Sequence, residues 1–237
     1  GWGRSGETWN FMDALKQIGG ESWFLLGDRD LALHVERTRR KARGESLTAI
    51  AADIARRFGI RAKVLPVTDD RLRTMVATNE GELEFQRYFV ERRCEPIVSR
   101  IRFLGAEKSR MTGEVSHALR ADDLRMIVIC PSNPYLSVDP VLAVPGLADR
   151  IRAARVPVVA ISPIIGGQAI KGPTRKIMDE LNLAPTNAEI ARHYAGLIDG
   201  LVVDTSDAAE ARDLGIAIHA APTLMTDQQS KIGLAKE

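Results

Sequence analysis

Two short polar segments of this sequence directly follow apolar runs, and they hold side chains that could bind a ligand. The first stretch reads MIVICPSNPYLSVDP, from Met126 to Pro140. The second reads VPVVAISPIIGGQAIKGP, from Val156 to Pro173. An apolar run without alternation that ends in a polar turn and precedes a helix is typical of a central strand in a parallel sheet. Because ligands bind outside the carboxyl ends of such strands, the two turns predict one site between them.

The second turn has the composition of an anion-binding loop. Gly166 and Gly167 would let backbone amides approach an anion closely, and Lys171 adds a positive charge. The Gly-Pro that follows suits the first turn of a helix, whose N-terminus favours phosphate. The same residues could instead form an ordinary loop with a capping Gly-Pro. Ser132 and Asn133 leave a similar choice, since they could cap the next helix or bind a ligand.

Two further polar turns carry acidic residues. Arg29 stands between Asp28 and Asp30, an arrangement in which flanking carboxylates could hold a guanidinium toward a planar or anionic group. The alternative is a local salt bridge at a helix start, and either aspartate could cap the helix that follows. Asp69 and Asp70 could form a solvated turn or part of a Mg²⁺ site, which takes one or two carboxylates and phosphate oxygens.

The other reactive side chains form no recognisable catalytic set. The sequence has no Ser-His-Asp order that supports nucleophilic catalysis and no Cys/His cluster with zinc-ligand spacing. Cys94 and Cys130 are far apart, and Cys130 lies inside an apolar strand pattern, so we expect a buried reduced thiol and a cytoplasmic protein. His34 shares a helix face with Arg37, whereas His193 fits an ordinary, partly buried histidine. These patterns assign no catalytic residue.

Composition and charge exclude several classes of protein. The 237 residues are 45% hydrophobic and 27% charged, which is ordinary for a globular domain. The 33 basic and 31 acidic residues give a net charge of +2, so nothing favours nucleic acid or a membrane surface as a partner. No apolar run approaches the roughly 20 residues needed to span a bilayer, and no signal-peptide pattern is present.

Strand and helix patterns alternate regularly from residue 126 onward, which is typical of βαβ units in an α/β protein. We expect strands over residues 126–130, 156–161, 200–203 and 217–219, and helices over 137–144, 147–154, 174–181, 187–195, 206–214 and 228–236. Upstream, we expect helices over 8–18, 31–42, 47–58 and 113–120, strands over 22–26, 62–67 and 97–104, and a hairpin of 73–78 with 82–86.

This order of elements predicts a single α/β domain over residues 1–237, with a helical and hairpin insertion over residues 28–100. A parallel α/β domain usually opens with a strand and a glycine-rich turn. Here the first clear pattern is a helix. We therefore expect the chain to be the C-terminal portion of a longer protein.

An ordered set of short motifs now becomes recognisable. The sequence contains GDRDLALHVERT, VLPVTDD, FQRYFVERR, PSNPYLSVDPVLAVPG and SPIIGGQAIKGP, with GWG…ETW before them and PTLMTD after them. Together they resemble the 2-phospho-lactate transferases of coenzyme F(420) biosynthesis over essentially the whole chain. The resemblance implies a Rossmann-like fold: a parallel sheet with helices on both faces and a helical/hairpin insertion that forms part of the substrate site.

The resemblance also implies an activity and a set of small-molecule partners. Family members transfer a phospho-lactyl group, or its phosphoenolpyruvyl or phosphoglyceryl equivalent, from a guanosine diphosphate-linked donor to a deazaflavin alcohol called Fo. GMP leaves, and Mg²⁺ is required. A homodimer is plausible for this family. Which of the three acids is carried stays open.

Site residues follow from the resemblance motif by motif. Contacts with the deazaflavin are expected from Arg29, Asp28, Asp30, His34 and Gln86. The donor and its phosphates are expected to contact Ser132, Asn133, Pro134, Ser137, Ser162, Gly166, Gly167, Lys171 and Gly172. Metal contacts are expected from Asp69 and Asp70.

Some features differ from the family pattern and keep other interpretations open. The family's glycine-rich GGxGG-like loop and PDLDT-like segment do not occur in these residues, and Leu33 stands where a Thr is usual. One alternative is a non-catalytic nucleotide-sugar-binding regulator of the same superfamily, and another is a fragment with an exposed sheet edge. Arg29 and Asp30, together with the SPIIGGQAIKGP segment, favour the transferase.

Overall fold

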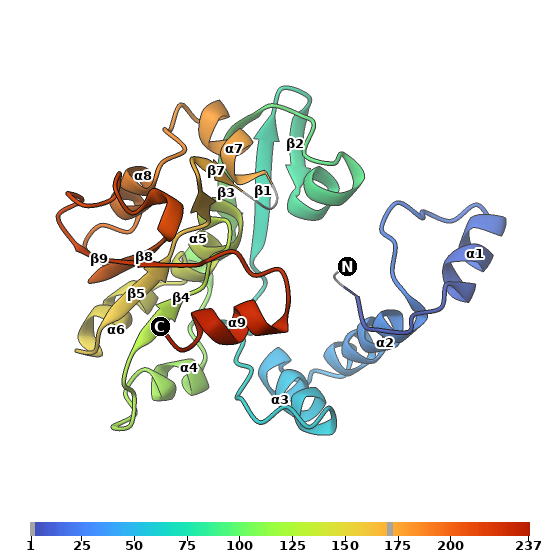
Figure 1. The fold of residues 1–237 in the computed structure, drawn as a ribbon. Helices are drawn as coiled ribbons and strands as arrows, with labels where there is room; N and C mark the ends of the chain where they lie inside the picture. The colour runs from blue at the N-terminus through green and yellow to red at the C-terminus, as the bar shows by residue number, and fades with distance from the viewer. Residues whose placement is uncertain (1–2, 170–172) are drawn as a thin grey trace.

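The protein consists of a body built on two β-sheets and an arm of three helices, which the computed structural model describes over residues 3–169 and 173–237. The body contains a four-stranded parallel sheet and a three-stranded antiparallel sheet (Figure 1). Strands alternate with helices in the parallel part. The predicted α/β, Rossmann-like class is therefore confirmed.

The parallel sheet has the strand order β4-β5-β8-β9. Its strands are β4 (Ile127–Ile129), β5 (Val158–Ile161), β8 (Gly200–Asp204) and β9 (Ala217–Ala221). Between β4 and β5 run η3 (Pro134–Val138), α5 (Asp139–Leu142) and α6 (Leu147–Ala153), and between β5 and β8 run β6 (Ile164–Ile165), β7 (Gln168–Ala169), α7 (Thr174–Glu180) and α8 (Asn187–His193). The chain then ends with α9 (Gln228–Leu234). These positions match the predicted strands and most of the predicted helices.

β4 does not have the central position that its apolar sequence predicts. Among the described strands it pairs only with β5, so it lies at an edge of the sheet. Met126 is 50% exposed and Val128 is 48% exposed. Cys130 is exposed too, which corrects the expectation of a buried thiol. The central positions belong to β5 and β8, whose Ala160 and Leu201 are almost completely buried.

The predicted helix over 206–214 is wrong. The structure has one short 3₁₀ turn there, η4 (Thr205–Asp207), followed by turns up to β9. The Asp204 carboxylate accepts hydrogen bonds from the backbone N and the Oγ of Ser206, at 3.0 and 2.7 Å. Such a local side-chain bond offers the backbone an alternative to the helical hydrogen-bond pattern.

The antiparallel sheet contains the predicted hairpin. Its order is β2-β1-β3. Asn79 lies in the turn of the hairpin. Its Oδ1 accepts the Ile97 amide at 2.8 Å, which holds the chain in place just before the third strand of this sheet. Gly81 has a φ of 110°, a conformation that favours glycine. The elements of this region are β1 (Arg73–Thr78), β2 (Gly81–Glu84), the π-helical η1 (Arg87–Glu91), β3 (Val98–Leu104), η2 (Ala106–Lys108) and α4 (Gly113–Ala118).

Two predicted strands before the hairpin are absent. Residues 22–26 and 62–67 have no strand assignment in the structure. The second segment makes one isolated bridge just beyond its end, between Thr68 and Met111. Pro66 has no N–H to donate, so continuous pairing through it is disfavoured. Residues 22–26 lie within the arm of three helices, and residues 62–67 join this arm to the body. Neither segment extends a sheet.

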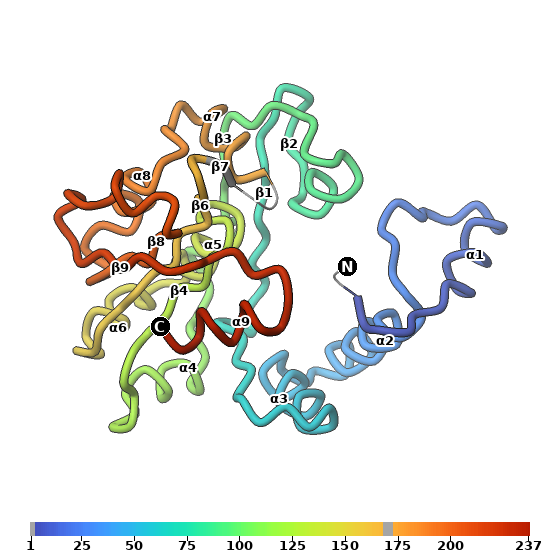
Figure 2. The backbone as a smooth tube through the Cα atoms, in the orientation of Figure 1, coloured from blue at the N-terminus to red at the C-terminus, as the bar shows by residue number. Residues whose placement is uncertain are grey.

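The arm contains α1 (Asn10–Gln17), α2 (Asp28–Ala42) and α3 (Leu47–Arg57). It projects away from the sheets to the right of the view (Figures 1 and 2). The α2 helix has no buried residue. As predicted, Ser46 caps α3, and its side chain accepts the Ala49 amide at 3.1 Å.

Charged groups connect α2 to α3. Asp53 on α3 accepts hydrogen bonds from Arg40 of α2 and from Arg57, each at 2.9 Å, and also pairs with Arg56. Arg40 also pairs with Glu45. The Arg57 hydrogen bond and those from Arg40 and Arg56 outweigh partial burial and lower the pKa of Asp53 to about 2. Charge pairing therefore helps to hold α2 against α3.

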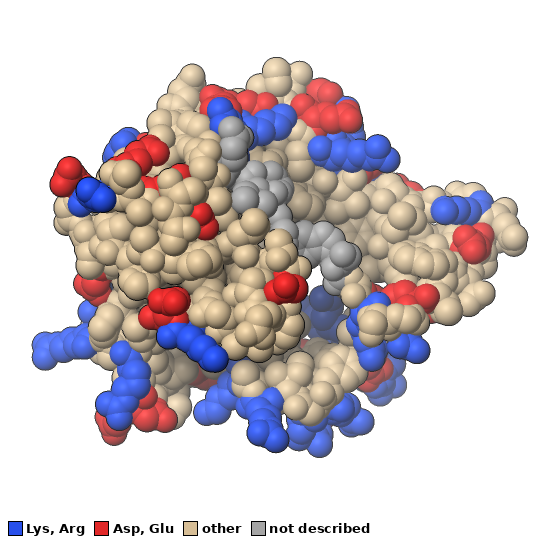
Figure 3. All heavy atoms as spheres, in the orientation of Figure 1, with Lys and Arg blue, Asp and Glu red and all other residues tan. Residues whose placement is uncertain are grey.

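One contact between the arm and the body is made by a side chain of η1. Arg87 donates to the Glu21 carboxylate at 3.5 Å, and its guanidinium lies 5.2 Å from the Trp23 ring centre. It also donates to Glu91 at 2.9 Å. Between the arm and the body, Figure 3 shows the visible face hollowed.

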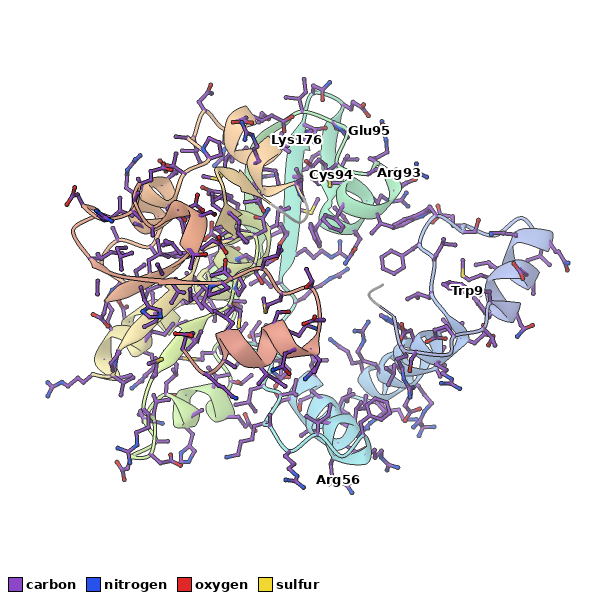
Figure 4. All side chains as sticks on the ribbon, viewed as in Figure 1. Trp9, Arg56, Arg93, Cys94, Glu95 and Lys176 are labelled. Atoms are coloured by element: carbon purple, nitrogen blue, oxygen red, sulfur yellow. The ribbon has the colours of Figure 1, made fainter. Side chains whose placement is uncertain are left out.

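The apolar core lies between the two sheets and the α7 and α8 helices. Its fully buried side chains include Ile164, Ile177, Met178 and Ile190. Lys176 of α7 lies beside Cys94 and Glu95 (Figure 4), and its Nζ donates to the Pro96 carbonyl at 2.8 Å. Glu180 accepts the Val98 amide at 2.9 Å. These bonds fasten α7 to the start of β3.

We predict that Asp53→Asn loosens the arm. The substitution removes a charge that three arginines neutralise, so amide hydrogen exchange in α2 and α3 becomes faster. Because the folded-state pKa of Asp53 is lowered from 3.8 to about 2, its contribution to stability is complete above pH 3.8 and is lost as the pH falls toward 2. Hydrogen-exchange mass spectrometry measures both effects.

Glu36→Gln is the control for this experiment, because Glu36 pairs with Arg39 within α2 and both side chains are nearly half exposed. Exposed pairs of this kind contribute little. Equal exchange rates in the two variants would contradict the role given to Asp53.

Candidate functional site

A small cavity opens where the two predicted turns meet. Its volume is about 90 Å³. It is lined by Pro131, Asn133, Ser162, Pro163, Ile165, Thr174, Thr223, Leu224 and Met225. The turn after β4 and the turn after β5 thus share one cavity at the carboxyl edge of the parallel sheet, as the sequence predicts.

Asn133 has two structural roles at this cavity. Its Oδ1 accepts the Leu136 amide at 2.9 Å, which caps η3. Its Nδ2 donates to Thr174 Oγ1 at 3.1 Å, which links the first turn to the start of α7. Pro134 is buried as the first residue of η3, whereas Ser132 and Ser137 are exposed and do not line the cavity. The Asn133 side chain therefore caps η3 and lines the cavity at the same time.

The second turn is held from several directions. Ser162 is 1% exposed, and its Oγ accepts the Ile164 amide at 3.1 Å. Gly166 and Gly167 have φ values of 57° and 67°, in the left-handed region. The Gly166 amide donates to Asp207 Oδ2 at 2.9 Å, so it already has a partner in the protein. Lys171 and Gly172, the other residues predicted here, lie outside the described residues.

Sequence reasoning missed part of the cavity wall. Thr223, Leu224 and Met225 belong to the PTLMTD motif, which counted toward the resemblance but received no role. Thr174 was missed as well. The available signal was position, since residues 222–225 directly follow β9 and such segments gather at the carboxyl edge of a parallel sheet.

The cavity lining combines apolar side chains with four polar ones, and none of the described lining residues is charged. Its hydrogen-bonding side chains are those of Asn133, Ser162, Thr174 and Thr223. These groups can bind and orient a ligand, but they include no strong nucleophile or general base. Displacement at phosphorus needs positioning and charge neutralisation more than covalent help from the protein. The described lining therefore supplies groups that could position a ligand, but it supplies no charge.

The GDRD turn lies on the arm, and its hydrogen bonds differ from the prediction. Asp28 begins α2 and caps α1, because it accepts the Asn10 and Phe11 amides at 3.2 and 3.1 Å. The Thr8 hydrogen bond, at 2.6 Å, is the main cause of its lowered pKa. The predicted cap of α2 by Asp28 or Asp30 is replaced by Gly27 as N-cap residue.

Glu7 supplies the carboxylate at the start of α2. It accepts the Arg29 amide at 2.8 Å and the Asp30 amide at 3.1 Å. The exposed Arg29 side chain donates to the Ser5 carbonyl at 2.9 Å. Within residues 3–169 and 173–237, Arg29 forms no ion pair with its flanking aspartates, so they do not hold its guanidinium as the sequence suggested.

The other predicted deazaflavin contacts are divided between arm and body. His34 lies on α2, and its Nδ1 is 3.0 Å from Arg37 Nη2. Partial burial, and then the charge of Arg37, lower the pKa of His34. Gln86 is exposed on the body, just before η1. In the part of the chain that the structure describes, no hydrogen bond joins the GDRD turn to the cavity lining.

Asp69 and Asp70 already have protein partners. Asp69 Oδ1 accepts the backbone N and the Oγ1 of Thr48, at 2.8 and 3.0 Å. Asp70 Oδ2 accepts the Arg110 amide at 2.9 Å, and the Arg110 side chain lowers the pKa of Asp70. These two carboxylates therefore do not fit a ready-made metal site, and among the described residues no three His, Cys, Asp or Glu side chains form one. The magnesium assignment stays a prediction.

The fold is that of an α/β protein with a cavity at the carboxyl edge of its parallel sheet. Comparison with known families makes this more specific, since residues 7–229 match the family described as "2-phospho-L-lactate transferase CofD". The chain belongs to this family, and it is a transferase.

Similar proteins carry a related name. A phosphoenolpyruvate transferase of Streptomyces griseus is 38% identical over 246 residues, which cover 100% of this chain and 77% of that protein. One of Mycobacterium avium is 36% identical over 239 residues, which cover 96% of this chain and 70% of that protein. These names agree with the resemblance seen in the motifs.

The fold also resembles solved structures. Two crystal structures of a Bacillus halodurans protein of the UPF0052 family have TM-scores of 0.58 and 0.60, at 17% and 18% identity. Each comparison covers 89% of this chain and 72% or 71% of the other. At this identity the likeness concerns the fold alone. None of the helices in the described residues has the length and apolar character needed to cross a membrane.

We predict that Asn133 and Thr174 are energetically coupled. Asn133→Ala loses a helix cap, worth about 1 kcal/mol of the free energy of unfolding. In a double-mutant cycle with Thr174→Val, the lost hydrogen bond gives a coupling of about 0.5–1.5 kcal/mol. Urea denaturation of the four proteins measures it.

The control cycle replaces Asn133→Ala with Thr186→Ala. Thr186 caps α8 in the same manner, accepting the Glu189 amide at 3.2 Å. Its effect should add to that of Thr174→Val without coupling. Additive behaviour in both cycles would exclude the contact between Asn133 and Thr174.

Proposed function

We propose that this chain transfers a phosphoenolpyruvyl, phospho-lactyl or phosphoglyceryl group from a guanosine diphosphate-linked donor to the deazaflavin Fo, in coenzyme F(420) biosynthesis. Family membership and the relatives' names support this proposal. The observation that carries it is the shared cavity of the PSNP and SPII turns, at the sheet edge where such folds bind nucleotides. Among the three acids, the names of the similar proteins favour phosphoenolpyruvate.

The reaction is a displacement at phosphorus. The terminal hydroxyl oxygen of Fo forms a bond to the phosphorus that carries the three-carbon acid. The bond from that phosphorus to the oxygen it shares with GMP breaks, GMP leaves with the electron pair, and the hydroxyl proton is lost to solvent. The four polar side chains of the cavity wall would hold the donor in line for this attack.

Charge neutralisation has to come from outside the described cavity lining, because that lining is neutral. We propose a requirement for Mg²⁺, which would neutralise the donor's phosphates when bound. Arg29 is exposed on the arm and permanently charged, and with Asp28, Asp30, His34 and Gln86 it is our proposal for contacts with the deazaflavin.

The first experiment supplies Mg²⁺, Fo and each of the three guanylylated phospho-acids in turn, and follows GMP release. We expect fastest release with the phosphoenolpyruvate donor, a new deazaflavin phosphodiester, and loss of the reaction with EDTA. If no donor yields GMP and the protein instead binds a nucleotide sugar tightly, the non-catalytic regulator is the correct interpretation.

A separate prediction concerns the binding of Fo by Arg29. Arg29→Ala removes a cation that no described carboxylate neutralises, so the dissociation constant for Fo should rise by roughly tenfold to a hundredfold, the effect expected for a hydrogen bond to a charged group. Fo fluorescence titration measures it. Arg39→Ala is the matched control on the same helix, because Arg39 is paired with Glu36 at 2.7 Å. Unchanged Fo affinity in Arg29→Ala would remove this assignment.

A further inference from the structure

Two carboxylates stand directly behind the cavity wall without lining it. Asp204 ends β8, and Asp207 ends the short η4 turn that follows. They are only 7% and 4% exposed. Neither belongs to a motif that the sequence singled out. Their hydrogen bonds reach two different walls of the cavity.

Asp204 holds the wall that follows β9. Its Oδ2 accepts the Thr223 amide at 3.0 Å and the Thr223 hydroxyl at 3.2 Å. Its Oδ1 is occupied by Ser206, so both carboxylate oxygens are in use. Thr223 itself lines the cavity together with Leu224 and Met225. This wall therefore depends on a single ionised side chain.

Asp207 holds the opposite turn. Its Oδ2 accepts the Gly166 amide at 2.9 Å, across 41 residues of sequence. Gly166 is in the left-handed conformation, and Ile165 immediately before it lines the cavity. Glycine occupies a wide range of backbone angles, so contacts must restrain this turn. They include the pairing of β6 with β7, the Arg175 side chain, which donates to the Gly167 carbonyl at 2.9 Å, and the Asp207 carboxylate.

We propose that Asp204 and Asp207 are positioning residues that set the shape of the donor cavity and therefore its affinity for a guanosine diphosphate ligand. The identity of that ligand rests on the proposed function. The placement of the two walls rests only on the hydrogen bonds described above. Because the two carboxylates share one short turn, the walls are fixed relative to each other as well as to the sheet.

Electrostatics supports an ionised Asp204 in this role. Burial alone would raise the pKa of Asp204, but the hydrogen bonds from Ser206 and Thr223 outweigh burial, and its pKa is lowered. The carboxylate thus remains charged at neutral pH and accepts on both oxygens. An amide in its place offers one acceptor oxygen and a competing NH₂ donor.

The test compares Asp204→Asn, Asp207→Ala and Asp207→Asn with a control at the other end of the same strand. Asp199 precedes β8, and its Oδ2 accepts the Val158 amide at 2.8 Å. Asp199→Asn therefore alters a similar carboxylate–amide bond at the sheet edge away from the cavity. Amide hydrogen exchange measures the mobility of the two cavity walls, and calorimetry measures the affinity for GDP.

We expect Asp204→Asn to speed exchange at residues 223–225, and Asp207→Ala to speed it at residues 164–167. Each should raise the Kd for GDP by roughly tenfold to a hundredfold, since small misplacements of binding groups are costly. Asp207→Asn should keep most of the affinity, because one oxygen suffices there. Asp199→Asn should change the GDP affinity less than twofold, even if it lowers stability.

The outcomes separate this proposal from the proposed function. If Asp204→Asn and Asp207→Ala bind GDP as Asp199→Asn does, or if exchange at the two walls is unchanged, the positioning role is wrong. If the wild-type protein fails to bind GDP, the donor assignment falls. The exchange measurements then still decide whether the two carboxylates hold the walls.

Discussion

Parallel pairing of β4, β5, β8 and β9 is the constraint on which the rest of the structure depends. It brings the carboxyl ends of all four strands to one edge, so that segments near residues 133, 162 and 223 meet although they are far apart in sequence. A sheet edge of this kind leaves backbone amides without strand partners. Asn133, Ser162 and the carboxylates that follow β8 accept those amides, and the same bonds give the cavity its walls.

The body and the arm are stabilised by different forces. The body buries a continuous apolar cluster between its sheets and α7 and α8. The arm buries far less, since α2 has no buried residue and large side chains such as Trp9 and Ile18 are 47% and 81% exposed. There, ion pairs around Asp53 and helix caps from Asp28 and Glu7 add to the packing of a few buried side chains such as Met12 and Ile50. The GDRD motif and the two turns that line the cavity thus lie on parts that are stabilised differently.

Local patterns predicted most elements, and non-local contacts decided the rest. Apolar runs located all four parallel strands, and Ser46 and the hairpin turn behaved as their residue types predict. The edge position of β4, and with it the exposure of Cys130, depends on which strands pair, which an apolar run cannot specify. Asp28 capping a helix 18 residues earlier, and Thr223 reaching the cavity, are likewise contacts between distant residues with no local signal.

The contact of Arg87 with Glu21 and Trp23 has a consequence for how the arm is held to the body. Its charged side chains are 42% and 73% exposed, and exposed pairs of this class contribute little to stability. Dissolved salt weakens them further. The Arg87 contact should therefore weaken as the ionic strength of the medium rises, whereas the hydrogen bonds of the buried Asp204 and Asp207 are screened much less.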